Sequence, residues 1–90
     1  MSEALRRLRA EIDAVDAQLL ELLSRRAAMV LEVQQVKARE DMPRVDNPRM
    51  EQILDRLVAL NKGPLTPEEV RDVYGELLKF FAHRLGAART

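Results

Sequence analysis

Two basic residues occupy positions of an apolar repeat that would ordinarily face a protein core. Apolar side chains recur at spacings of three and four over residues 5–36, and Arg26 follows Leu22 by four residues, as Lys37 follows Val33. An unpaired buried cation is unfavourable, so each of these side chains needs an anion or a route to water. Because the arginine fork matches a planar carboxylate, the pair predicts a site for a small dianion between helices.

Two structural explanations compete with a ligand site. Long basic side chains can lie along apolar surface with their charged ends in solvent. Alternatively, Glu32 or Asp46 could neutralise Arg26 and Lys37 as internal ion pairs. The sequence leaves these alternatives open, although two such cations in one stripe, eleven residues apart, favour a ligand.

Two further arginines lie near this stripe. Arg9 directly follows Leu8 and by itself is typical of a solvated helix face. Arg49 falls in the first turn of a second predicted helix, where a cation opposes the helix dipole, which is weak evidence for a role elsewhere. The single His83 has no neighbours at metal-ligand spacing, and the chain has no cysteine, so we expect no metal site.

Three helices and no strand are predicted to position these residues, so the expected fold class is all-α. Local capping signals mark where the helices begin: Ser2 for the first, Asp46 followed by Pro48 for the second, and a capping box of Thr66 with Glu69 for the third. Proline and glycine mark their ends. The predicted helices occupy residues 1–42, 46–61 and 66–86.

The first helix is too long for a compact monomer of this size. About 38 residues extend about 57 Å at the rise of an α-helix. A compact globule of 90 residues is only about 30 Å across. Because residues 1–42 contain no glycine or proline to kink the helix, part of it is expected to pack against a second chain.

Composition limits the remaining classes of function. Ninety residues form one domain, 1–90, and the 15 basic and 15 acidic residues cancel, so no basic field is available to bind nucleic acid. No apolar run is long enough to span a membrane, and the N-terminus lacks a signal-peptide pattern. We therefore expect a cytoplasmic protein.

Several of these residues form a motif that resembles the all-helical (AroQ-class) chorismate mutases over essentially the whole chain. The motif consists of Leu8, Arg9, Ile12 and Asp16, then Arg26 ten residues later, Lys37 eleven further on, and finally Asp46 with Arg49. The Asn-Lys-Gly-Pro turn at 61–64 is also similar to members that are fused to DAHP synthase.

This resemblance implies a fold, a reaction and a set of site residues. The fold would be an intertwined homodimer, and the reaction would rearrange chorismate to prephenate in phenylalanine and tyrosine biosynthesis without a cofactor. Arg26, Lys37, Asp46 and Arg49 would line a pocket that Arg9 of the second subunit completes. A DAHP synthase would be a fused or associated partner. The rearrangement requires a dicarboxylate held in a compact conformer and positive charge at the breaking ether bond.

Three candidate substrate-binding positions depart from the family pattern. Met50 stands where a glutamate commonly contacts the substrate hydroxyl, and Phe81 stands in place of a small polar residue. Leu85 replaces a glutamine that would share the ether oxygen with the lysine. The adjacent Glu51 and Arg84 lie about 100° further round their helices, so neither is expected to substitute. We therefore expect weak activity alone, or activity that depends on a partner.

Two other functions stay open at this point. The same cationic pocket would allow a regulatory domain to sense prephenate or chorismate for a DAHP synthase. An isochorismate pyruvate lyase shares the fold and an aromatic pair near Phe80 and Phe81, so that activity is a further alternative.

Overall fold

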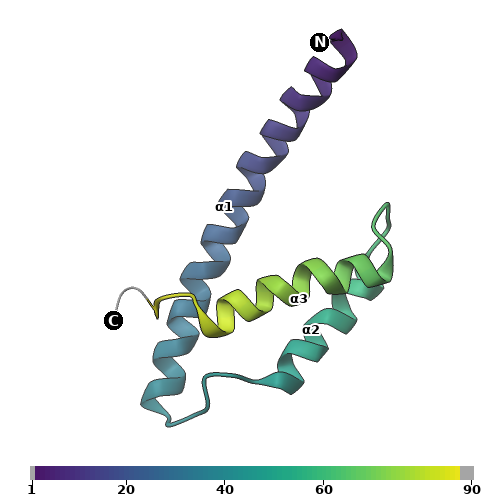
Figure 1. Cartoon of the computed structure of the whole chain (residues 1–90). Helices are drawn as coiled ribbons and strands as arrows, with labels where there is room; N and C mark the ends of the chain where they lie inside the picture. Colours follow the sequence, from purple (N-terminus) through teal and green to yellow (C-terminus); the bar gives the residue numbers. More distant parts are fainter. Residues whose placement is uncertain (1, 88–90) are drawn as a thin grey trace. The chain divides into compact units, whose positions relative to one another are not determined.

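The computed structural model describes residues 2–87, and within that range the chain forms three α-helices and no strand (Figure 1). Its contacts divide it into two units, Met1–Val30 and Leu31–Thr90. The all-α prediction is confirmed for the described residues. The helices are α1 (Glu3–Arg39), α2 (Asn47–Leu60) and α3 (Pro67–His83).

Helix α1 begins where its sequence predicts and ends a few residues earlier than expected. The Ser2 hydroxyl oxygen accepts a hydrogen bond from the backbone N–H of Leu5 at 3.0 Å, which confirms the predicted N-cap. At the other end Asp41 adopts a positive φ of 54°, and the Met42 N–H donates to the Lys37 carbonyl at 2.8 Å. This is a Schellman-type ending, so a left-handed residue rather than Pro43 terminates the helix.

The predicted caps of α2 and α3 are also present. The Asp46 carboxylate accepts from the Arg49 N–H at 3.0 Å. The Thr66 hydroxyl oxygen accepts from the Glu69 N–H at 3.1 Å, while the Glu69 carboxylate accepts from the Thr66 N–H at 2.9 Å. Both bonds of the capping box therefore form, and each satisfies a backbone donor that helix geometry leaves without a partner.

The core of residues 31–87 is built mainly from α3, which packs against α2. Its buried side chains recur at spacings of three, four and eight, as one helical face requires. These buried residues are Val70, Leu78, Phe81 and Leu85.

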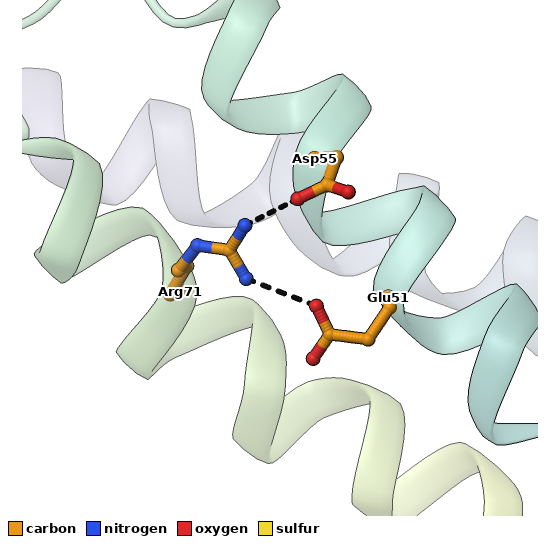
Figure 2. Close-up of polar contacts among 3 residues, drawn as sticks. All are labelled: Glu51, Asp55 and Arg71. Atoms are coloured by element: carbon orange, nitrogen blue, oxygen red, sulfur yellow. Dashed lines mark hydrogen bonds and ion pairs between the residues drawn. The ribbon is translucent and has the colours of Figure 1, made fainter.

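An ion-pair cluster joins α2 and α3 on the outside of this core (Figure 2). The Arg71 guanidinium of α3 pairs with Asp55 and, at 3.3 Å, with Glu51, both on α2. The hydrogen bond to Asp55, followed by the one to Glu51, raises the pKa of Arg71 above its usual value. All three side chains are exposed enough for water to screen the attraction, so the cluster orients the helices more than it stabilises them.

Residues 3–30 of helix α1 carry an apolar stripe that is exposed to solvent. No residue of α1 is buried, and large side chains on the stripe are between 40% and 59% exposed. Exposure of an aliphatic surface of this extent to water is unfavourable. The exposed residues are Leu5, Leu8, Ile12, Val15, Leu19, Leu22 and Met29.

Candidate active site

Lys37, near the C-terminal end of α1, is held by the loop that follows its helix. Its side chain is half-buried, and its ammonium group donates a hydrogen bond to the Arg44 carbonyl at 3.1 Å. Within residues 2–87 the ammonium pairs with no carboxylate, so neither Glu32 nor Asp46 neutralises it there. The ammonium is thus positioned by a neutral partner, and its charge remains available to a ligand.

A cavity of about 400 Å³ opens beside this ammonium group, between the end of α1 and the start of α2. Asp46, whose carboxylate caps α2, lines the same cavity as Lys37. The chemistry of the wall combines one cation, one carboxylate and apolar surface, which suits a small ligand with an anionic group. The cavity is lined by Lys37, Met42, Pro43, Val45, Asp46, Asn47 and Pro48.

Arg49 and Met50 lie in the first turn of α2, next in the chain after the cavity wall. The Arg49 guanidinium is exposed and donates to the Gln52 side-chain oxygen at 2.8 Å. Met50 is half-buried, and its backbone N–H donates to the Asp46 carbonyl at 3.1 Å. Neither side chain lines the cavity beside Lys37.

The other two predicted cations belong to the unit Met1–Val30. Arg9 is exposed on α1, as expected for a residue beside the apolar stripe. Arg26 is half-buried within the stripe itself, which agrees with its predicted position between apolar neighbours.

The two departures on the third helix prove to be part of the core. Phe81 is 5% exposed and Leu85, just beyond the end of α3, is 7% exposed. The Phe81 ring meets Phe80 edge-on, with centroids 5.5 Å apart. Because the core encloses both side chains, neither lines the cavity beside Lys37. Their predicted contact with substrate therefore draws no support from this cavity.

The charged residues next to Met50 and Leu85 have partners elsewhere in the chain. Glu51, next to Met50, forms the ion pair with Arg71 across to α3 (Figure 2). Arg84, next to Leu85, places its guanidinium carbon 5.9 Å from the centre of the Phe80 ring, which is a cation–π distance. Both charged side chains therefore have a partner within the described chain.

Sequence reasoning missed two residues that hold the end of α3. The Arg44 guanidinium donates to the carbonyls of Ala82 at 2.7 Å and Leu85 at 2.8 Å. The Gln34 amide donates to the carbonyls of Phe81 and Leu85, both at 3.5 Å. Arg44 lies in a loop and Gln34 on α1, so no periodic or capping signal could have linked them to residues 38 to 51 positions later.

Across residues 2–87, no group of three or more His, Cys, Asp or Glu side chains is arranged to hold a metal ion. No helix in the same range combines the length and the apolar character that crossing a membrane requires. Lys37 supplies the only cationic side chain among the residues that line the cavity of residues 37–48.

Comparison with known proteins identifies the family. The sequence model described as chorismate mutase type II matches residues 8–84, which is most of the chain. The chain belongs to the chorismate mutase type II family. The resemblance drawn from the arginine and lysine spacing is therefore confirmed.

Two relatives of this chain are longer, bifunctional proteins. The chain is 37% identical over 81 residues to the bifunctional chorismate mutase/prephenate dehydratase of Pseudomonas aeruginosa, and 31% identical over 80 residues to that of Aquifex aeolicus. Each alignment covers 84% of this chain and 22% of the relative, so the chain spans about a fifth of their length. In both relatives the second enzyme is prephenate dehydratase and not DAHP synthase. The association of this chain with DAHP synthase therefore stays a prediction.

A solved structure of the same family matches the fold. The chorismate mutase of Thermus thermophilus superimposes with a TM-score of 0.85 at 34% sequence identity. The match covers 88% of this chain and 99% of that one. The three-helix architecture is therefore that of a chorismate mutase.

Proposed function

We propose that this chain catalyses the rearrangement of chorismate to prephenate, in the biosynthesis of phenylalanine and tyrosine. The observation that carries the proposal is the Lys37 ammonium, which a backbone carbonyl holds at the wall of a cavity with no carboxylate partner in the described chain. The reaction is inferred from membership of the chorismate mutase type II family. The position of Lys37 is consistent with it, because the reaction uses a positive charge in the site.

The proposed mechanism needs no covalent intermediate. Within one molecule a carbon–oxygen bond breaks while a carbon–carbon bond forms, and the electrons stay in the substrate. The ether oxygen gains negative charge as its bond to the ring breaks, and Lys37 stabilises that charge. Arg26, Arg49 and Arg9 of a second subunit hold the two carboxylates, which keeps the reacting carbons close. Asp46 positions the start of α2 and contributes to the wall.

The three departures shape the expected rate. Met50 offers no carboxylate for the substrate hydroxyl, and Leu85 offers no side-chain donor for the ether oxygen. We propose that Phe81 and Leu85 contribute apolar surface instead, behind the groups that touch substrate. Losing a donor at a developing negative charge typically costs about 10²-fold in rate, so slow turnover is expected.

Product identification tests the proposed function. The purified protein is incubated separately with chorismate and with isochorismate, and the products are separated and identified. Prephenate from chorismate is the expected result. Pyruvate released from isochorismate would instead indicate the lyase. Saturable chorismate binding without any product would indicate a regulatory domain.

We further propose that a second copy of the chain covers the apolar stripe of α1. The stripe from Leu5 to Met29 is exposed in the single chain, and burying it against an identical stripe would remove a large apolar surface from water. Sedimentation equilibrium at low micromolar concentration is expected to give twice the chain mass. A folded monomer under those conditions would contradict both the dimer and the contribution of Arg9 across subunits.

Replacing Arg26 by alanine is expected to weaken chorismate binding while the helix persists. A charge-assisted hydrogen bond to a carboxylate is lost, which corresponds to an increase in KM of about 10- to 100-fold. The far-UV circular dichroism should be unchanged, because an apolar residue suits a position within the stripe. A variant that unfolds but binds normally when folded would show that Arg26 belongs to a structural ion pair.

A further inference from the structure

We propose that Arg44 is a positioning residue, which holds the Lys37 ammonium in place by fixing the loop between α1 and α2 to the end of α3. The catalytic part of this inference rests on the proposed mutase activity. The structural part, the restraint of the Lys37 amine, stands on hydrogen bonds of residues 31–87 alone. The two parts therefore have separate tests.

The first link joins Lys37 to the backbone of Arg44. The ammonium donates to the Arg44 carbonyl at 3.1 Å, seven residues along the chain and past the end of α1. A lysine side chain has four rotatable bonds, so its charged end is well placed only where a fixed acceptor holds it. The position of the ammonium therefore depends on how firmly the loop holds that carbonyl.

The second link joins the Arg44 side chain to the end of α3. Two guanidinium nitrogens bind the Ala82 and Leu85 carbonyls at 2.7 and 2.8 Å, a two-pronged contact that lysine cannot reproduce. The last carbonyls of a helix have no intrahelical donor, and a cation there complements the helix dipole. Arg44 thus caps α3 from a distant loop and ties that loop to the core.

The third observation is that the end of α3 is itself anchored to α1. Gly86 has a φ of 82°, and a Cβ at this position would lie 3.1 Å from the Leu31 side chain. Gln34, one turn before Lys37, donates to the Phe81 and Leu85 carbonyls. The contacts therefore close a ring that runs from α1 through Lys37 and Arg44 to the end of α3 and back to α1.

This ring predicts a specific effect of removing the Arg44 guanidinium. The loop would lose its two bonds to α3, and the carbonyl that holds Lys37 would become mobile. Transition-state stabilisation depends on donors placed in advance, and displacements of about 1 Å can cost as much as 10²-fold in rate. Because the ether oxygen gains charge only as the bond breaks, the loss should appear in kcat rather than in KM.

The test compares Arg44→Met with Arg71→Met, an identical substitution at an arginine that also bridges two elements but does not contact Lys37 (Figure 2). We expect Arg44→Met to lower kcat about tenfold with KM within about twofold, and Arg71→Met to leave both within about twofold. Arg44→Lys, which retains a cation for the α3 carbonyls, should recover part of the lost kcat. Circular dichroism of each variant verifies folding. If Arg44→Met unfolds, the kcat and KM of Arg44→Lys are compared with those of the wild type instead.

A second readout does not depend on catalysis. Brief acetylation with acetic anhydride, followed by mass spectrometry, measures the reactivity of Lys37 against Lys62 and Lys79 in the same sample. We expect Arg44→Met to raise Lys37 labelling about threefold relative to both references, and Arg71→Met to leave it unchanged. Unchanged Lys37 labelling, or an unchanged kcat in a folded and active Arg44→Met variant, would overturn the proposal. A wild type without mutase activity would instead contradict the proposed function, and labelling alone would then decide the role of Arg44.

Discussion

Replacing Lys37 by methionine is expected to lower kcat for chorismate rearrangement by about 10²- to 10³-fold, the usual cost of losing a donor at a developing oxyanion. Methionine retains most of the lysine stem, and the side chain is only half-buried, so the fold should persist. KM should change much less, because the ether oxygen carries little charge in the ground state. Steady-state kinetics on the wild type and the variant measure both quantities.

Lys79→Met is the matched control for that substitution. Lys79 lies on α3, its side chain is 65% exposed, and its ammonium pairs with Glu76 one turn earlier. The same change there should leave kcat within about twofold, because an exposed pair of this kind contributes little. Retention of more than a tenth of wild-type kcat by Lys37→Met would show that another group carries the ether-oxygen interaction.

Replacing Phe81 by alanine is expected to destabilise the fold by about 3–5 kcal/mol, the range for truncating a buried phenylalanine. The Phe81 ring is almost fully enclosed and makes an edge-on contact with Phe80. A small domain is stable by only about 5–15 kcal/mol in total, so this loss should be plain in urea unfolding at fixed chain concentration.

Phe80→Ala is the comparison for this prediction. The two phenylalanines are adjacent, but the Phe80 ring is 40% exposed and contacts the Arg84 guanidinium on one face. Folding buries less of the Phe80 side chain than of the Phe81 side chain. Truncating Phe80 should therefore lower the free energy of unfolding by clearly less than truncating Phe81. If Phe80→Ala destabilised the fold more than Phe81→Ala, the main apolar contact of this part of α3 would lie on a second subunit.

Local signals in the sequence determined the helices and the family. Ser2, Asp46 and the capping box at 66–69 each act on backbone groups within three residues, so their hydrogen bonds follow from local geometry. The spacing of Arg26 and Lys37 in the apolar stripe likewise follows from helical periodicity. That spacing led to the resemblance that the family match confirms.

Other features depended on which distant groups the fold brings together. The sequence shows Phe81 and Leu85 as departures from a pattern, and only the packing of residues 31–87 shows that both are buried. Glu51 meets Arg71, and Arg44 meets the carbonyls of Ala82 and Leu85, across separations of 20 to 41 residues. Such contacts leave no periodic trace, because a hydrogen bond requires particular atoms to meet in space and constrains the chain between them very little.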